Sequence, residues 1–164
     1  TPMVGESPTT TPSESASTSP TAGTSTAPTS TASSGPAVKA TGTLKLFAPT
    51  SKKLAGTCQN KAGAPTLTVA DRKNDFFHTV DAAVVLTGDK SAVSTVTIAL
   101  GEDSEEITRT ITYDAAKPTA GVSAKLGVKG AVYTVSGKLA NAEDGTPAGT
   151  IPVTLVITCA STKW

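Results

Sequence analysis

Few residues in this sequence could carry out chemistry. There is one histidine, His78, and there are two cysteines, Cys58 and Cys159. A Ser-His-Asp or Cys-His arrangement would have to use His78, but its setting, NDFFH, has no nucleophile signature. Without a second histidine or a CxxC pair, the sequence also lacks the ligand spacing of a zinc site. We therefore expect His78 to be an ordinary surface or partly buried residue, and we expect no catalytic residue, metal, cofactor or enzyme activity.

The two cysteines are predicted to form a disulfide bond with each other. In the strands expected around them, Cys58 shares an apolar face with Leu54 and Cys159 shares one with Ile157, so both thiols point inward. One pair near the two ends of a domain suits an oxidising compartment. A bridge that closes a loop of about 100 residues would contribute about 4 to 5 kcal/mol in the chain-entropy model. Two buried free thiols are the alternative.

Two charged features could bind ions or each other. The segment GEDSEE at 101–106 contains four carboxylates, which could attract a hard cation such as Ca²⁺. Its spacing does not match an EF-hand loop, so we expect a solvated hairpin turn. Arg109 shares a strand face with Ile111 and Tyr113. We expect it to lie near a sheet end and to extend its charge to water, and a buried guanidinium with a partner is the alternative.

Short strands must position these residues. Apolar and polar side chains alternate at period 2, most clearly in 131–139 and 151–159, and turn residues separate such runs. This half-buried pattern predicts an all-β fold, an antiparallel β-sandwich over residues 40–164. We expect 71–78 to be an irregular or one-turn helical connection. The predicted strands cover 43–47, 54–58, 66–70, 80–86, 91–100, 106–113, 122–126, 131–139 and 151–159.

The first 39 residues have a different composition. Thr, Ser, Ala, Pro and Gly make up almost all of them, with no aromatic residue and no Lys or Arg before Lys39. Such a segment cannot bury enough apolar surface to fold, so we predict a disordered Ser/Thr/Pro-rich stalk over 1–39. The composition is typical of an O-glycosylated spacer, with an unmodified linker as the alternative. The O-glycosylation candidates are Thr9, Thr10, Thr11, Thr18, Thr21, Thr24, Thr26, Thr29 and Thr31.

Charge and hydropathy exclude two classes of partner. The net charge is +1 and the lysines form no basic patch, so the sequence does not predict nucleic-acid binding. The longest apolar runs, such as AAVVL at 82–86, are far shorter than the roughly 20 residues that a membrane-spanning helix needs. The first residue is Thr, so we expect a signal peptide, if there is one, to lie upstream of this chain.

Several stretches of the sequence are similar to a known family. They are AVVLTGDKSAVSTVTIALG (83–101) and VYTVSGKLANAEDGTPAGTIPVTLVITC (132–159), preceded by a Ser/Thr-rich tail that ends in SSGPAV (33–38). In order, they contain a Leu-Thr-acidic turn, a strand ending in Leu-Gly, a Tyr-x-x-x-Gly strand, a long polar loop and a terminal Thr-Cys. This order resembles the mycobacterial nineteen-kilodalton lipoprotein antigen family, the LpqH-like lipoproteins, over about 54–159.

The resemblance implies an exported lipoprotein and glycoprotein of the cell envelope. It implies anchoring to the outer face of the plasma membrane or to the cell surface through an acylated, palmitate-bearing cysteine, partial secretion, and host innate-immune receptors or lectins as partners. That cysteine would lie upstream of Thr1 and is not in this chain.

Two functions follow from these observations. The first is a non-enzymatic surface antigen or adhesin, in which 1–39 is a glycosylated spacer and the β domain is displayed to the exterior or to a host. The alternative is a lipid or glycolipid binding module of the envelope, with its ligand held between the sheets. An apolar cavity would distinguish the second from the first.

Overall fold

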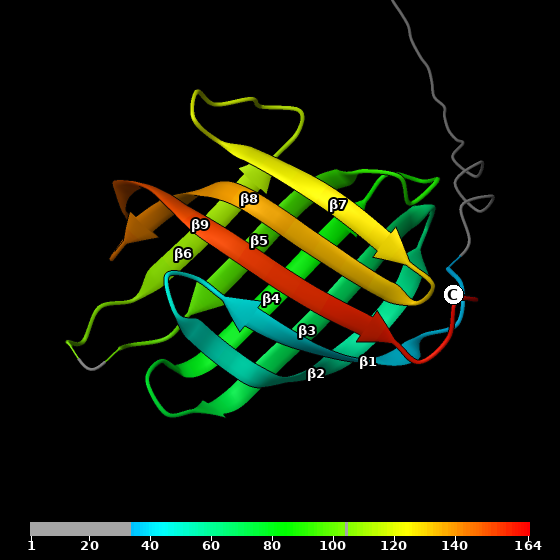
Figure 1. Ribbon diagram of the computed structural model, residues 1–164, viewed down its shortest axis with the longest axis horizontal. Coiled ribbons are helices and arrows are strands. Elements are labelled where there is room, and N and C mark those ends of the chain that lie inside the picture. The colour runs from blue at the N-terminus through cyan, green and yellow to red at the C-terminus, as the bar shows by residue number, and fades with distance from the viewer. Residues whose placement is uncertain (1–33, 104) are drawn as a thin grey trace, which may run out of the picture. The chain divides into compact units, whose positions relative to one another are not determined.

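The protein was analysed as a computed structural model that describes residues 34–103 and 105–164. These residues form nine strands, all paired antiparallel, which confirms the all-β class (Figure 1). The O-glycosylation candidates lie outside the described residues. The strands are β1 (Val38–Lys45), β2 (Pro49–Lys61), β3 (Ala64–Asn74), β4 (His78–Leu86), β5 (Val93–Leu100), β6 (Arg109–Asp114), β7 (Ser123–Lys129), β8 (Val132–Glu143) and β9 (Thr146–Cys159).

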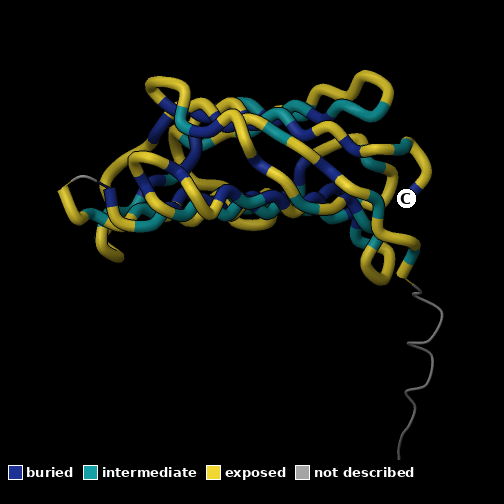
Figure 2. The backbone as a smooth tube through the Cα atoms, turned by 90° about the horizontal axis from the view of Figure 1, so that it is seen from below, coloured by how far each residue is buried: buried dark blue, intermediate teal, exposed yellow. Residues whose placement is uncertain are grey.

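The strands form one sheet that closes into an eight-stranded barrel, so the predicted sandwich is wrong. The order is β6-β5-β4-β3-β2-β1-β9-β8, and β6 pairs back onto β8. Strand β7 pairs with the first part of β8, up to Lys138, and is not part of the closed ring. Figure 2 shows buried and exposed residues following one another along the chain in both layers, and this alternation predicted the inward and outward positions correctly without revealing the closure.

A change of partner along β8 makes the closure possible. Its first part, up to Lys138, pairs with β7, and its last four residues pair with β6. The register of β8 against β9 shifts between Ala140, which pairs with Thr150, and Ala142, which pairs with Pro147, so β9 has one extra residue at 148–149. A bulge of this kind bends a strand and increases its twist. Sandwiches and small barrels share the same period-2 alternation, so the sequence pattern does not reveal this switch.

The barrel interior is filled by aliphatic side chains from every strand of the ring. Leu67, Val84, Ile98, Ile111 and Leu155 are all fully buried. The segment 71–78 is mostly strand rather than an irregular or helical connection, because β3 continues to Asn74 and β4 begins at His78. None of the described residues forms a helix that is long and apolar enough to cross a membrane.

The predicted disulfide is confirmed. Cys58 on β2 and Cys159 on β9 are bonded, with Cα atoms 6.0 Å apart and 101 positions between them in the sequence. Both are buried, as their inward-facing positions required. Strand β1 lies between β2 and β9, and its residues Val38 and Ala40 are the register partners of Cys58 and Cys159. The bridge therefore joins the two neighbours of β1 beside the first residues of that strand.

The described chain enters at one end of the barrel, which we call the entry end. There the Gly35 amide donates to the Asn60 carbonyl at 2.8 Å, and the Gln59 side-chain amide donates to the Gly35 carbonyl at 3.0 Å. Strand β1 then runs to the opposite end, where the β1–β2, β3–β4, β5–β6 and β8–β9 connections lie (Figure 1). Hydrogen bonding to the barrel thus starts upstream of β1.

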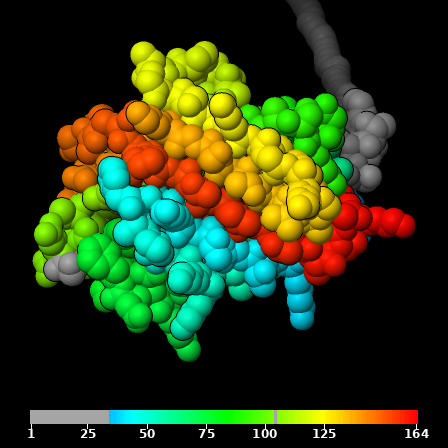
Figure 3. Space-filling model, viewed as in Figure 1, coloured from blue at the N-terminus to red at the C-terminus, as the bar shows by residue number. Residues whose placement is uncertain are grey.

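Trp164 covers the core at the entry end. It is 8% exposed, and its ring packs edge-on against Tyr133 with centroids 5.6 Å apart. The ammonium group of Lys90 lies 3.8 Å from the ring centroid and donates to the Trp164 carbonyl at 3.0 Å. Burial lowers the pKa of Lys90. Figure 3 shows the C-terminal residues, in red, gathered at this end of the molecule.

The turn between β4 and β5 is expected to make the stability of the fold depend on pH. Asp89 accepts hydrogen bonds from the Thr87 hydroxyl at 2.6 Å and from the Ser91 hydroxyl and amide at 2.7 and 3.1 Å. These bonds favour the carboxylate and lower the pKa of Asp89 from 3.8 to about 2. The stabilisation is complete above the unfolded-state pKa and is lost as the pH falls from about 4 towards 2.

We expect the Asp89 carboxyl carbon to titrate with a midpoint near pH 2 in an NMR pH series. Asp89→Asn should weaken the acid dependence of stability between about pH 4 and pH 2. A midpoint at the ordinary aspartate value would contradict the hydrogen bonding described for this turn.

Candidate functional site

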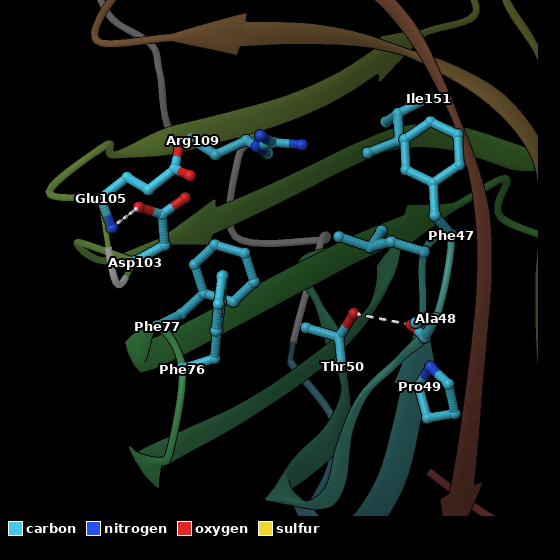
Figure 4. A pocket seen from close by; sticks show the side chains of 11 residues that line it. Phe47, Ala48, Pro49, Thr50, Phe76, Phe77, Asp103, Glu105, Arg109 and Ile151 are labelled. Atoms are coloured by element: carbon cyan, nitrogen blue, oxygen red, sulfur yellow. Dashed lines mark hydrogen bonds between the residues drawn. The ribbon is translucent and has the colours of Figure 1, made fainter.

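A pocket of about 490 Å³ opens at the end of the barrel opposite the entry end. We call this pocket and its lining residues the mouth (Figure 4). Seven of its eleven lining residues are apolar, and they include all three phenylalanines of the sequence. Its volume lies within the range of small-molecule sites, about 300 to 1,000 Å³. The lining residues are Leu46, Phe47, Ala48, Pro49, Thr50, Phe76, Phe77, Asp103, Glu105, Arg109 and Ile151.

Two of the phenylalanines are exposed at the rim of the mouth. Phe47, between β1 and β2, is 74% exposed, and Phe76, between β3 and β4, is 48% exposed. Phe77 is buried, and its ring lies edge-on to Phe76 with centroids 4.8 Å apart. Figure 4 shows Phe47 beside Ile151 on one side of the pocket and the other two rings on the opposite side. Burying an exposed phenylalanine is worth about 1.5 to 3 kcal/mol, so this rim favours binding of an apolar group.

A buried amide holds the Phe76–Phe77 turn in place. The Asn74 side-chain oxygen accepts hydrogen bonds from the Phe76 and Phe77 amides at 3.0 and 2.9 Å. The Asn74 side-chain NH₂ group donates to the Thr50 carbonyl at 2.7 Å, so the turn is fixed to β2. The Asn74 side chain therefore links the turn that carries Phe76 and Phe77 to Thr50, which also lines the mouth.

Asn74 is itself held by a buried polar cluster. It donates to an Asp71 carboxylate oxygen at 3.3 Å, and the same oxygen accepts from the Ser51 hydroxyl at 2.6 Å. All three residues are buried. The hydrogen bond from Ser51 is the main cause that lowers the pKa of Asp71, so the group is a carboxylate at neutral pH. The cluster positions the turn and does not line the pocket.

Two residues of the acidic segment, Asp103 and Glu105, form a polar wall of the mouth. Oδ1 of Asp103 accepts hydrogen bonds from the Glu105 and Ile107 amides at 2.7 and 3.1 Å, which folds the loop around this buried side chain. Asp103 and Glu105 line the pocket, whereas Glu102 is exposed outside it. Within 34–103 and 105–164, no three His, Cys, Asp or Glu side chains are grouped as metal ligands would be.

Arg109 is paired rather than directed to water, so the alternative for this residue is the one observed. It begins β6 opposite Glu143 on β8, and its Nη2 lies 2.8 Å from the Glu143 carboxylate. Its side chain is 17% exposed and extends into the mouth (Figure 4). The pair therefore joins the two strands that close the barrel. Among the described residues Nη1 has no acceptor, and it is not enclosed by the protein.

A comparison with protein families identifies the relatives of this barrel. The model of the Mycobacterium 19 kDa lipoprotein antigen matches residues 47–160, which span β2 to β9 and both cysteines. The chain belongs to this family. No curated protein and no solved structure matches it significantly. Membership in the 19 kDa lipoprotein antigen family implies association with the cell envelope and its membrane, and this is not a known enzyme family.

In this member of the 19 kDa lipoprotein antigen family, the mouth is suited to binding. The histidine that could have served catalysis, His78, is exposed at the start of β4 and does not line the pocket. The side chains that do line it are aromatic, aliphatic, carboxylate and guanidinium groups. They can bury hydrocarbon and exchange hydrogen bonds with a polar group.

The mouth could not be predicted from the alternation of apolar and polar residues in the sequence of this antigen. Its phenylalanines lie in connections between strands, at 47 and 76–77, where the period-2 pattern carries no information. A usable signal was present, because all three phenylalanines lie beyond the ends of strands, and two of them, Phe47 and Phe76, are not part of the core. Which connections meet at one end of the barrel follows only from the topology.

Proposed function

We propose that this chain is a displayed envelope antigen, with a disulfide-linked barrel carried on a glycosylated spacer. The spacer is residues 1–33, because Ser34 and Gly35 already bind the barrel, and it is attached upstream to the membrane by an acylated cysteine. Family membership supports a lipoprotein antigen, and the dense hydroxyl and proline content of 1–33 supports glycosylation. Display to a host, and contact with host receptors or lectins, are part of this proposal.

The observation that carries the proposal is that the first described residues and the mouth lie at opposite ends of the barrel. Ser34 and Gly35 bind the barrel at the entry end. The Ser34 hydroxyl accepts a hydrogen bond from the Ala62 amide, and the Gly35 amide donates to the Asn60 carbonyl. The mouth opens at the other end. The described part of the chain therefore begins at the end of the barrel opposite the mouth.

The test compares native protein from its own host with a variant in which residues 1–33 are replaced by a Gly/Ser linker of equal length. The replacement stops at 33 because Ser34 and Gly35 bind the barrel. Intact-mass measurement should show hexose and acyl increments on the native protein, and the variant should lose the hexoses together with binding to a hexose-specific lectin. Its melting temperature should be unchanged. Native protein without hexose on these threonines, or a lower melting temperature in the variant, would overturn the proposal.

The mouth supports a second candidate function, which is binding of an apolar chain. The supporting observation is the mainly apolar pocket with its exposed Phe47 and Phe76. This is the lipid or glycolipid binding alternative, with the ligand at the end of the barrel rather than between sheets. Family membership alone does not test it.

An uncharged dye, Nile red, tests the second function on the full chain. We expect its fluorescence to rise on binding, and Phe47→Ser and Phe76→Ser each to weaken binding at least five-fold. Val128→Ser is the matched control, because Val128 is 49% exposed on β7 and does not line the mouth. Equal effects of all three substitutions, or no binding by the wild type, would rule out the mouth as an apolar site.

A further inference from the structure

The polar wall of the mouth presents donors and acceptors side by side. Arg109 offers Nη1, which has no acceptor among the described residues, and Glu105 offers an exposed carboxylate. Asp103 uses Oδ1 for two backbone amides, and no described residue donates to its Oδ2. A hydroxyl group both donates and accepts, so a group bearing several hydroxyls can satisfy this wall, whereas a pure donor or a pure acceptor cannot.

The charges of the wall disfavour an anionic ligand, and its guanidinium donor is poorly suited to a cationic one. The guanidinium of Arg109 is already neutralised by Glu143 at 2.8 Å, and two more carboxylates, of Asp103 and Glu105, face the same pocket. An anionic headgroup would therefore meet an excess of negative charge. A cationic headgroup would be attracted by these carboxylates, but it would lie beside the Arg109 guanidinium and would offer its Nη1 no acceptor.

We propose that the mouth binds an amphiphile with an uncharged, hydroxyl-rich headgroup, such as an acylated or alkylated sugar. The inference rests on the second function proposed above and specifies its ligand. The hydrocarbon chain packs among Leu46, Phe77 and Ile151, and the exposed rings of Phe47 and Phe76 cover it at the rim. The headgroup lies against Asp103, Glu105 and Arg109. Its hydroxyls can accept from the Arg109 guanidinium and donate to the Asp103 and Glu105 carboxylates.

The experiment measures displacement of Nile red from the full chain by three amphiphiles with the same chain length, each below its micelle concentration. They are dodecyl maltoside, sodium dodecanoate and dodecyltrimethylammonium chloride. We expect the maltoside to bind at least ten-fold more tightly than either ion. Trp164, the single tryptophan, lies at the entry end, so its fluorescence should stay constant and report that the barrel remains folded.

Two glutamates of one loop give a matched pair of variants. Glu105→Gln should weaken maltoside binding at least three-fold, because Glu105 lines the pocket, while Glu102→Gln should leave it unchanged, because Glu102 does not. The double variant Arg109→Met/Glu143→Gln removes the wall's donor without leaving an unpaired charge, and it should weaken maltoside binding to a similar extent.

The outcomes separate this inference from the function on which it rests. Binding of dodecanoate or of the ammonium compound as tight as that of the maltoside would overturn the headgroup inference and leave the apolar site intact. So would equal effects of Glu105→Gln and Glu102→Gln. Failure of Nile red itself to bind would overturn both.

Discussion

Replacing both cysteines, in Cys58→Ala/Cys159→Ala, is expected to lower the free energy of unfolding by about 4 to 5 kcal/mol. The bridge spans 101 positions of sequence, so it restricts most of the unfolded chain. A domain of this size has a total stability of only about 5 to 15 kcal/mol. Urea denaturation at neutral pH, followed by far-UV circular dichroism, measures the difference.

Reduction provides the control for this prediction. A thiol reductant should lower the urea midpoint of the wild type towards that of the double variant, and it should not change the midpoint of the variant. A loss of less than about 1 kcal/mol would show that the barrel without the bridge is already stabilised by its closed sheet.

Gly56→Ala is expected to destabilise the barrel by about 3 kcal/mol or more, or to prevent folding. Gly56 lies on β2 opposite Val69 of β3. A Cβ atom there would overlap the Thr68 carbonyl oxygen and lie 2.8 Å from the Val69 Cα. These are backbone atoms, so two paired strands would have to move apart to accept one methyl group.

Gly127→Ala is the matched control, because Gly127 also lies within a strand. Its nearest neighbour would be the Thr134 Cβ at 3.9 Å, an ordinary van der Waals contact. We expect its unfolding free energy to be within about 1 kcal/mol of the wild type, or slightly higher, because alanine reduces the entropy of the unfolded chain. Similar losses at both positions would contradict the close approach described for Gly56.

The sequence allowed prediction of those fold features that depend on local alternation. Leu155, Ile157 and Cys159 share one face of their strand and Thr154 and Thr158 share the other, so the inward orientation and the disulfide could be predicted. The closure did not follow, because it depends on a bulge in β9 at 148–149 and on β8 exchanging one partner for another. Pairing between distant strands leaves no trace in the period of either strand.

The candidate site was less predictable than the fold. Arg109 was noticed as a charge on an apolar strand face, but its partner, Glu143, is 34 positions away and is brought opposite it only by the closure. Asp103 was expected in a solvated turn, and the structure buries it as the acceptor that organises the loop. When the partners of a residue lie far away in the sequence, its role can be recognised only once the pairing of the strands is known.

The place of the disulfide beside β1 has a mechanical consequence. A pulling force applied at Ser34 first reaches the hydrogen bonds of Ser34 and Gly35 and then β1, whose hydrogen bonds to β2 and β9 resist motion along the strand in shear and in parallel. Shearing requires many of these bonds to break together, whereas peeling would break them one at a time. The bond between Cys58 and Cys159 joins the two flanking strands beside the residues where the load arrives, so they cannot spread apart there. A barrel with this geometry can be held by its N-terminal side against drag without unravelling from that side.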